Sequence, residues 1–429
     1  MTKTILSLLL SASLPLGACG SRLPVTGGTV NAAASPSYPA PVAFDDFEAS
    51  YEIRTQNEVG DGVLDELRGF SAQTSAALLD GSQNACYSPA SLYFALSLSA
   101  AGSRGDTRTQ LLHLLGNGAA DAANCAKLYR QLYTDNEIGQ LKIANSLWMA
   151  NQLDGKPVTF DKDFLSTASR DFYASLFTAS LSAPVTLSAM ADWVKENTGG
   201  KITPQFEANP QALLYLMNTI YLKDEWTDWF DASQNTEDPF YLADGTTRQA
   251  TFMHAMHLSG FLRGESYTSA SLALKNLGGV TFVLPDPGVR LDSLLTESRL
   301  AGLLSGGTEE QRRYGRVYWA APKFSYATKL ELSDMLKAAG VTDLFDRERA
   351  DLSGMTQSEA FLSGAQQQTY IAVNEQGVEA AAYTELFYAG SGMPEEEAYM
   401  TLNRPFLYFI TARNGAPLFV GVCAQPDAA

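Results

Sequence analysis

The sequence predicts an α+β fold built around a large hydrophobic core. Helical stretches dominate the first part of the chain, and strand-like runs dominate its later part. The two kinds of segment do not alternate with the strand–helix rhythm that is typical of parallel α/β proteins. Hydrophobic residues make up 45% of the chain, which is enough to bury a sizeable core.

Hydrophobic periodicity places the expected elements along the chain. Ser88 can cap a buried helix that begins at Pro89, because proline is tolerated in a first helical turn. Helices are expected over residues 69–79, 89–101, 107–115, 161–177 and 330–339. Strands are expected over residues 213–222 and 280–285, and a hairpin is expected from 406–410 and 417–422 across Asn414-Gly415.

The first residues predict an export signal. Lys3 supplies a positive start, and the apolar stretch 5–16 is too short to span a bilayer. The run Leu16-Gly17-Ala18-Cys19 resembles a bacterial lipobox, which would make residues 1–18 a lipoprotein signal peptide and Cys19 an acylated first residue. The alternative is a plain secretory cleavage that leaves Cys19 as an ordinary thiol. We expect a membrane anchor through lipidated Cys19.

Residues 19–45 are rich in Pro, Ala, Gly, Ser and Thr and predict a flexible tether after the anchor. Gly20 follows Cys19 where an inner-membrane retention signal would place an aspartate, so we expect an extracytoplasmic, cell-surface or outer-membrane lipoprotein. From its length, the remaining chain could be one large domain or two fused domains.

The charge and cysteine counts exclude several classes of protein. The formal net charge is −17, and no basic run is longer than Arg312-Arg313, which argues against nucleic acid or a heparin-like polyanion as a partner. If Cys19 carries lipid, the remaining Cys86, Cys125 and Cys423 can form at most one disulfide. Cys86 and Cys423 lie among apolar residues and are expected to pack in the core.

A search for catalytic or metal-binding motifs finds little. His254 and His257 have a spacing that could hold a metal, but Met253 and Met256 beside them indicate a packed hairpin, so no metal or other cofactor is expected. The sequence has no nucleophile elbow, phosphate-binding loop or H-E-x-x-H motif. A Ser/His/Asp triad assembled in space keeps a surface hydrolase open as an alternative, because triads have no fixed order along a chain.

The informative stretch follows the apolar strand 370–373. Gly377 can act as a hinge, and the next residues read as a strand with one uncharged face. That face holds Val378, Ala380, Ala382, Thr384, Leu386 and Tyr388. The other face holds Glu379, Ala381, Tyr383, Glu385 and Phe387. Small residues at 389–394 then resemble an exposed loop tip, so the pattern is a hinge, a buryable strand and a cleavable tip.

These residues resemble the reactive-loop hinge of inhibitory serpins, in which a glutamate, a glycine and a run of alanines precede the cleaved bond. Further segments similar to serpins occur in the expected order. They are residues 84–91, 101–107, 144–148, 193–194 with 198–202, 218–226, 322–324, 403–406 and 418–421. The resemblance covers roughly residues 60–426 and implies a single serpin domain over 46–429.

The resemblance implies a serpin fold, with a large mixed β-sheet, two smaller sheets, about nine helices and an exposed reactive loop. It also implies irreversible, suicide-substrate inhibition of a serine or cysteine protease by a monomeric protein. The protease would cut the loop, and residues 378–391, here called the arm, would insert into the main sheet. The implied hinge residues are Glu375, Gly377, Val378, Ala380, Ala381 and Ala382, and the implied sheet-opening residues are Ser88, Ser91, Asn218 and Trp226.

The family's usual loop length places the cut bond between Ser391 and Gly392, with Met393 as a rival position. Small or apolar residues there favour an elastase- or subtilisin-like target. Three positions depart from the family pattern: Ala191 and Gln367 replace an asparagine and a histidine of the sheet-opening region, and Tyr383 is unusually bulky. The first two departures motivate the alternative of a non-inhibitory, serpin-fold surface binding protein.

Overall fold

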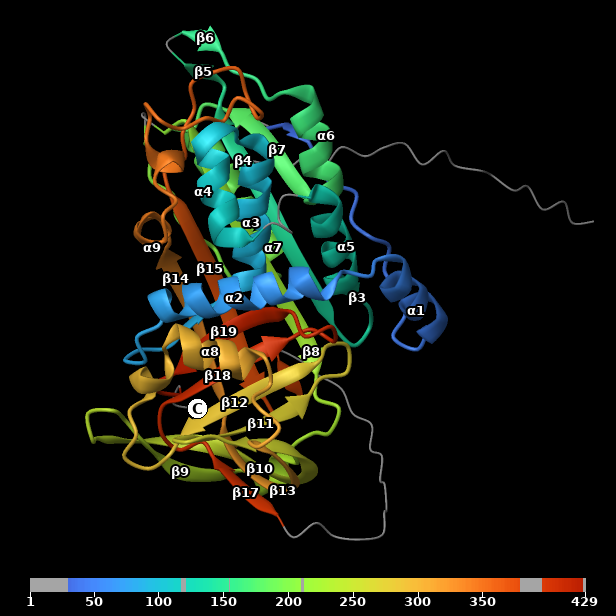
Figure 1. Ribbon diagram of the computed structural model, residues 1–429, viewed down its shortest axis with the longest axis vertical. Coiled ribbons are helices and arrows are strands. Elements are labelled where there is room, and N and C mark those ends of the chain that lie inside the picture. Colours follow the sequence, from blue (N-terminus) through green and yellow to red (C-terminus); the bar gives the residue numbers. More distant parts are fainter. Residues whose placement is uncertain (1–29, 117–120, 154, 210–211, 379–395, 427–429) are drawn as a thin grey trace, which may run out of the picture.

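The computed structural model describes residues 30–116, 121–153, 155–209, 212–378 and 396–426. Two large sheets and nine α-helices make up most of these ranges (Figure 1). Among the residues described, no helix combines the length and apolar character needed to cross a membrane. The observed mixture of helices with mainly antiparallel sheets is the predicted α+β class.

The helices lie mainly in the first half of the chain, as predicted. They are α1 (Phe47–Gln56), α2 (Asp61–Leu78), α3 (Pro89–Gly102), α4 (Gly105–Leu115), α5 (Ala122–Leu132), α6 (Lys162–Asp171), α7 (Pro184–Asn197), α8 (Glu297–Leu304) and α9 (Ser333–Ala338). Helix α3 is buried on nearly every face, and the Ser88 side chain caps it by accepting a hydrogen bond from the Ser91 N–H.

The first sheet has eight strands and carries the region implicated by the sequence. Its order is β1 (Ala32–Ala34), β7 (Ala174–Ala179), β4 (Gln140–Ala150), β8 (Leu214–Glu225), β16 (Gly377–Val378), β15 (Ala365–Asn374) and β14 (Phe324–Glu331), with β3 (Thr134–Asp135) paired to β4. The strand pairs β4–β7 and β8–β15 are parallel and the others are antiparallel, so the sheet is mixed.

The second sheet has nine strands. Its order is β17 (Glu397–Thr401), β13 (Arg312–Pro322), β10 (Thr247–Arg263), β11 (Tyr267–Ala273), β12 (Gly279–Pro285), β18 (Phe406–Thr411), β19 (Pro417–Cys423) and β2 (Ala85–Tyr87), with β9 (Thr236–Tyr241) paired to β10. A two-stranded ribbon of β5 (Gln152–Leu153) and β6 (Lys156–Pro157) completes the described sheets. Strands β18 and β19 form the predicted hairpin.

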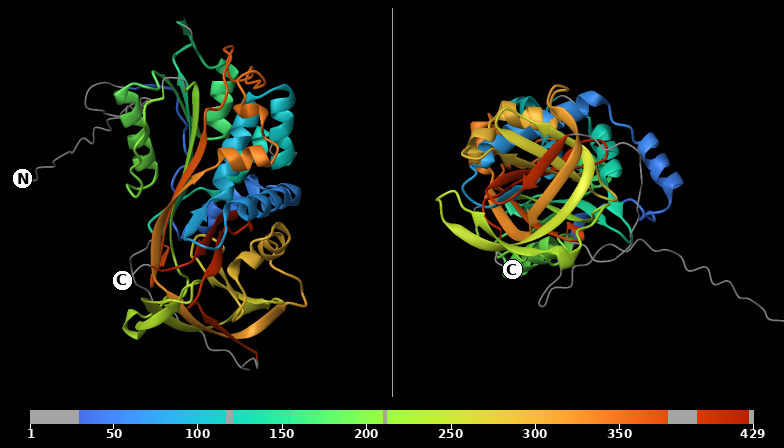
Figure 2. Two further views of the ribbon diagram at one scale, coloured as in Figure 1. Left: turned by 90° about the vertical axis from the view of Figure 1, so that its left-hand side faces the viewer. Right: turned by 90° about the horizontal axis from the view of Figure 1, so that it is seen from below.

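The first sheet runs along the long axis of the molecule, with helices on both faces (Figure 2). The main core joins α2–α6 to one face of this sheet and to the second sheet. A smaller core lies on the other face, where Met190, Trp193 and Val194 of α7 pack near Trp148 and Met217. Side chains therefore alternate along β8 and β15 between the main core and the α7 side.

Three predicted helices have different bounds in the structure. The helix predicted over 69–79 is the second part of α2, which begins at Asp61. The helix predicted over 161–177 ends at Asp171, because Tyr173 has a φ of 49° and residues 174–179 form β7 beside β4. A left-handed residue cannot continue an α-helix. The helix predicted over 330–339 begins only at Ser333, because Leu330 and Glu331 pair with β15 as the end of β14.

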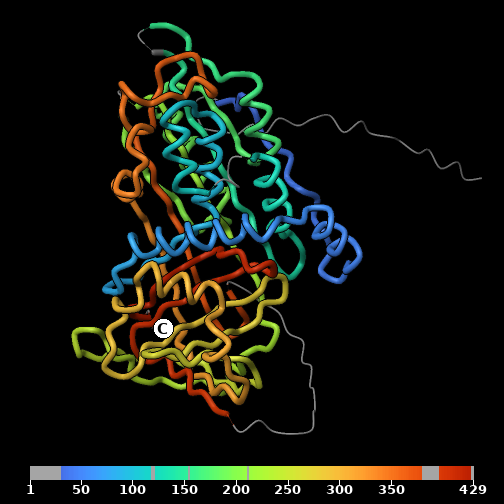
Figure 3. Tube along the Cα trace, in the orientation of Figure 1, coloured from blue at the N-terminus to red at the C-terminus, as the bar shows by residue number. Residues whose placement is uncertain are grey.

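The prediction of a flexible tether over residues 19–45 is wrong for its second half. Ala32–Ala34 add β1 to the edge of the first sheet, and the Tyr38 ring stacks within 6.1–6.5 Å of the rings of Tyr129, Tyr133 and Tyr173. Figure 3 shows this stretch in dark blue along the domain before α1. The pairing of β1 and the side chains of buried Val30 and half-buried Tyr38 fix a segment whose composition looks unstructured.

The structure places the two neighbouring histidines of β10 and the three cysteines of the domain. His254 and His257 are three residues apart on β10 and therefore point to opposite faces, so they cannot share a metal from that strand. Cys86, Cys125 and Cys423 are buried, and they form no disulfide within the described part of the chain. Burial raises the pKa of the Cys86 and Cys125 thiols to about 12, which keeps them protonated as packed core residues.

Candidate functional site

The candidate site is a wedge-shaped opening between β8 and β15 in the first sheet. The two strands pair directly only where Ala365, Gln366 and Gln367 lie opposite Leu216, Met217 and Asn218. At the other end of the opening, β16 lies between them and is antiparallel to both. In the described residues no strand fills the stretch between these two places.

Strand β16 is formed by the first two residues of the predicted hinge strand. Gly377 pairs with Glu225 of β8 and Asn374 of β15, and Val378 pairs with Asp224 and Val373. A Cβ on Gly377 would lie 2.2 Å from the Asp224 carbonyl oxygen, so only glycine fits there. The Val378 side chain is 1% exposed and joins the main core. The buryable face of the arm thus already points inward at its first residue.

Backbone and indole hydrogen bonds fix the hinge turn before β16. The Trp226 N–H donates to the Gln376 carbonyl at 2.9 Å, and its indole Nε1–H donates to the Asn374 carbonyl at 2.9 Å. The Phe230 N–H donates to the Glu375 carbonyl at 3.1 Å. Trp226, predicted in the sheet-opening set, is fully buried and belongs to this hinge end of the site.

An ion pair holds the Glu375 side chain. The Lys323 Nζ lies 3.0 Å from one carboxylate oxygen, and the Asn235 Nδ2 donates to the same oxygen at 2.6 Å. Burial alone would raise the pKa of Glu375, but hydrogen bonds from its backbone, Asn235 and Lys323, with the Lys323 charge, outweigh burial and lower that pKa. Sequence reasoning missed Asn235 and gave Lys323 no role, although Lys323 lies in the quoted segment 322–324.

Two buried carboxylates lie where the arm enters the sheet. Asp224 is fully buried and accepts hydrogen bonds from the Leu277 N–H at 3.0 Å and the Asn276 Nδ2 at 2.9 Å. Burial raises the pKa of Asp224 even though these bonds favour the carboxylate. Its neighbour Glu225 pairs with the Lys275 Nζ at 2.7 Å. These contacts fix the end of β8 on which β16 pairs.

A buried network of side-chain hydrogen bonds links β8 to β15 at the closed end of the opening. We call Ser88, Ser91, Asn145, Asn218 and Gln367 the latch. The Gln367 amide Nε2 donates to Asn218 Oδ1 at 3.3 Å and to the Ser88 carbonyl at 3.1 Å, and Gln367 Oε1 accepts from the Ser88 N–H at 2.7 Å. Ser91 Oγ also donates to Asn218 Oδ1, and Asn218 Nδ2 donates to Asn145 Oδ1 at 2.7 Å.

The latch changes the interpretation of the two departures from the family pattern. Ala191 lies on α7, whereas the asparagine opposite Gln367 in the sheet is Asn218. Gln367 therefore has an asparagine partner: its amide makes one hydrogen bond across the strands to Asn218 and two to the backbone of Ser88. The assignment of Ala191 to the position of the family's asparagine is wrong, because it was made from the sequence without the strand register.

The structure brings together most of the predicted residues that it describes. Ser88, Ser91 and Asn218 meet in the latch, while Glu375, Gly377, Val378 and Trp226 meet at the hinge end. The remaining predicted positions lie outside the described residues. These are the hinge alanines Ala380, Ala381 and Ala382, the reactive-site positions Ser391, Gly392 and Met393, and the lipidation site Cys19.

Comparisons with known proteins identify the class to which this fold and opening belong. The family model described as "Serpin (serine protease inhibitor)" matches residues 67–426. Human Serpin B11 is 30% identical over 368 residues, which is 80% of this chain and 93% of that protein. Horse Alpha-1-antiproteinase 2 is 29% identical over 83% of this chain and 85% of its own length. The chain belongs to the serpin family.

Solved structures show the same fold. The thermophilic serpin tengpin in its native state superposes with a TM-score of 0.75 and 23% identity, covering 91% of this chain and 97% of tengpin. Thyroxine-binding globulin in complex with thyroxine gives a TM-score of 0.71 and 22% identity, covering 85% of this chain and 99% of its own. The predicted serpin fold is therefore confirmed.

The latch should contribute measurably to the stability of the uncut protein. We expect Gln367→Leu to lower the free energy of unfolding by about 1–3 kcal/mol, because it leaves the buried Ser88 N–H unpaired and removes the hydrogen bond to Asn218. Urea unfolding measures this change. Gln366→Leu is the matched control, since Gln366 points to the other face and bonds to exposed Glu331. Equal effects of both substitutions would contradict the role of the latch.

The Glu375–Lys323 pair should make stability depend on pH in acid. The pKa of Glu375 is lowered by folding, so its contribution is present above its ordinary value of 4.5 and is lost as the pH falls through the lowered folded value. We expect Glu375→Gln to lose about 0.5–1 kcal/mol near neutrality, since the pair is partly exposed, and to match the wild type in strong acid. Melting curves across this range test it, and a difference that persists unchanged in acid would contradict it.

Proposed function

We propose that this protein is an irreversible, suicide-substrate inhibitor of serine or cysteine proteases. A protease would cut the loop after residue 391 and form an acyl-enzyme with the arm. The arm would then insert between β8 and β15 as a new central strand and carry the attached protease along. Strand insertion by serpin reactive loops is an established case of strand addition. The observation that carries the proposal is that Val378 already pairs with both strands at the mouth of the opening.

The register of Val378 defines where the following residues would pair. Each further residue of the arm would lie opposite one residue earlier in β8 and one earlier in β15, because β16 is antiparallel to both. The inward positions would be Ala380, Ala382, Thr384 and Leu386. Their partners would be the buried pairs Leu222 with Ile371, Ile220 with Thr369, Asn218 with Gln367, and Leu216 with Ala365. An uncharged face would thus meet a buried surface.

Side-chain burial must supply most of the free energy of insertion. Each new backbone hydrogen bond contributes about 1 kcal/mol, and ordering each residue costs about 1–2 kcal/mol, so these effects nearly cancel. Burying Leu386 contributes about 1.5–3 kcal/mol. The arm must also separate Asn218 from Gln367, and Thr384 would arrive between them. Its hydroxyl can replace part of the lost hydrogen bonding.

The tip of the loop suggests the kind of target protease. The bond between Ser391 and Gly392 is proposed as the scissile bond, with Met393 as the rival position. Small and apolar residues there suit an elastase- or subtilisin-like enzyme. We expect one such protease in a panel to form an SDS-resistant complex with this protein, and sequencing of the released C-terminal peptide identifies the bond.

A non-inhibitory, serpin-fold surface binding protein is the second candidate. Its support is the likeness to thyroxine-binding globulin and a cavity of about 600 Å³ lined by Arg68, Phe261, Leu304 and Arg312 among others. A protein of this kind would form no covalent complex with any protease, and cutting its loop would leave its melting temperature unchanged.

Arginine at neighbouring positions of the arm distinguishes the two faces. Ala380→Arg would place a charge between Leu222 and Ile371 in the main core, which costs several kcal/mol, so the variant should be cut and released as a substrate. Ala381→Arg would point to the other face, beside half-buried Tyr221 and Tyr370, and should still trap the protease. The stoichiometry of inhibition is the measurement. Equal behaviour of both variants would contradict the proposed register.

We also propose that the protein is anchored to a membrane through acylated Cys19, with its reactive loop facing away. Val30 is the first described residue, and the eleven residues from Cys19 span at most about 40 Å. Strand β1 pairs with β7 near the end of the molecule that carries β5 and β6, whereas β17, which follows the loop, lies at the opposite end (Figure 1).

Removing the acylated thiol tests the anchor. We expect Cys19→Ser to move the protein from the membrane fraction to the soluble fraction without changing protease trapping by the released domain. Fatty-acid labelling of the wild type but not of the variant should accompany this change. Membrane retention of the unlabelled variant would contradict the anchor.

A further inference from the structure

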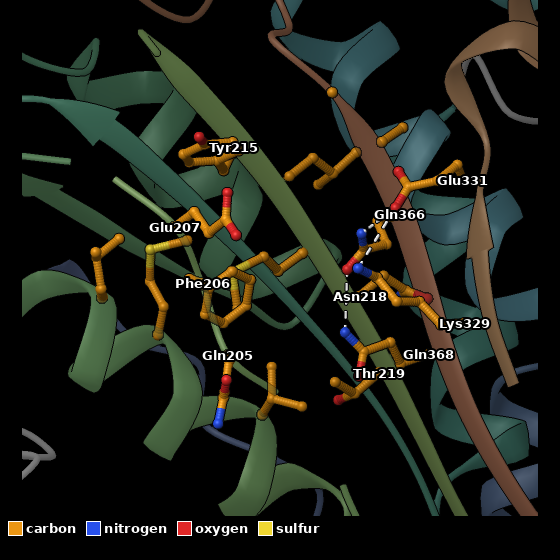
Figure 4. Close-up of a pocket in the computed structure, with 17 residues that line it drawn as sticks. Gln205, Phe206, Glu207, Tyr215, Asn218, Thr219, Lys329, Glu331, Gln366 and Gln368 are labelled. Carbon is orange, nitrogen blue, oxygen red and sulfur yellow. Dashed lines mark hydrogen bonds and ion pairs between the residues drawn. The ribbon is translucent and has the colours of Figure 1, made fainter. Parts of the chain in front are cut away.

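A cavity lies on the α7 side of the first sheet, over the place where β8 and β15 meet (Figure 4). Its volume is about 350 Å³. Helix α7 contributes the apolar side chains of Leu187, Met190 and Val194, and Phe206 lies beside them between the polar residues Gln205 and Glu207. The opposite wall is polar and carries Gln366, Gln368, Lys329 and Glu331. The cavity could therefore receive one face of a strand on which aromatic and polar side chains alternate.

A buried hydroxyl in this cavity lacks a partner. Thr219 is 1% exposed and lines the cavity, and its Oγ1 forms no hydrogen bond with the part of the chain that the structure describes. Buried hydroxyl groups are nearly always satisfied in native proteins. An unpaired hydroxyl at a cavity wall can form a hydrogen bond with a polar group that enters the cavity.

The register of β16 identifies that group. Alternate residues of the arm must point to the α7 side, because Val378 points to the main core. Tyr383 would lie between Thr219 and Gln368, and Phe387 between Tyr215 and Gly364. Glu385 would lie between Met217 and Gln366. All six of these partners line the cavity. Five of them lie on β8 or β15, and Gly364 directly precedes β15.

We propose that this cavity is the preformed receptor for the outward-facing aromatic side chains of the arm, Tyr383 and Phe387, so that both faces of the arm drive its insertion. The inference rests on the proposed function and adds to it. Gly199, just after α7, lies against the Tyr221 ring, so the C-terminal end of α7 lies toward Thr219. Val194 is therefore placed for Tyr383, and Leu187 for Phe387. The unusually bulky Tyr383 side chain would then fill part of this cavity.

The chemistry of the two walls matches these side chains. Each aromatic residue buries about 150–250 Å² when it packs in a core, and Leu187, Met190 and Val194 of α7 offer apolar contacts. The Tyr383 hydroxyl can serve the unpaired Thr219 Oγ1 and the Gln368 amide. Glu385 would lie against the polar wall near Gln366 and the Lys329–Glu331 ion pair, where its carboxylate can remain solvated.

The test compares cut and uncut forms of the full chain. The variants are Tyr383→Ala with Phe387→Ala, and Tyr399→Ala as a control that removes an exposed aromatic residue from β17. We expect the double variant to melt like the wild type when uncut, because β8 and β15 still meet at the latch. After cleavage of the loop it should gain less stability than the wild type, and Tyr399→Ala should gain as much.

Protease trapping supplies the second readout. We expect about tenfold more of the double variant to be released cut rather than trapped, a change equivalent to about 1.4 kcal/mol in the competing barriers. A double variant that gains stability and traps protease like the wild type overturns this inference and leaves the proposed inhibition intact. If the cut wild type gains no stability, the proposed function itself fails and the inference with it.

Discussion

The structure depends on one constraint: β8 and β15 belong to the same sheet but are hydrogen-bonded to each other only at Ala365–Gln367. Backbone N–H and C=O groups in a sheet need partners, and a parallel pair that diverges leaves both inner edges ready to pair with a strand between them. Gly377 and Val378 occupy the mouth of this gap and pair with both edges. The native sheet is therefore arranged to receive one more strand.

Contacts at the two ends of the gap between β8 and β15 keep it closed at one end and occupied by β16 at the other. At the closed end, the Gln367 amide joins Asn218 to Ser88 through buried hydrogen bonds that insertion must break. At the open end, Trp226 and the Glu375–Lys323 pair hold the turn that directs the arm inward. The inward and outward faces of the arm would then meet the main core and the cavity under α7. In the proposed mechanism, the stability of the uncut state and the ability of the arm to insert would thus depend on neighbouring contacts in one sheet.

Much of this site could be predicted from the sequence, because its signals are local. A hinge glycine followed by period-two alternation with one uncharged face predicts a strand that can be buried, and Val378, the one residue of that face within the described ranges, is buried in the main core. The helix at Pro89 and the hairpin at Asn414-Gly415 were equally local. The predictions that were wrong concerned contacts between residues far apart in the chain. The partner of Gln367 follows from register, which residue spacing alone does not provide, so Asn218 was not paired with it. Tyr38 anchors its segment through rings distant in the chain.

Hydrogen–deuterium exchange, compared before and after a single cut in the loop, tests the central claim most directly. Insertion would give the inner edges of β8 and β15 a hydrogen-bonded partner. The amides of Thr219–Lys223, of 368–372 and of the arm itself should then exchange far more slowly in the cut protein. Unchanged exchange in all three stretches after complete cleavage would show that the arm stays outside the sheet, and the account of this protein as a protease trap would be wrong.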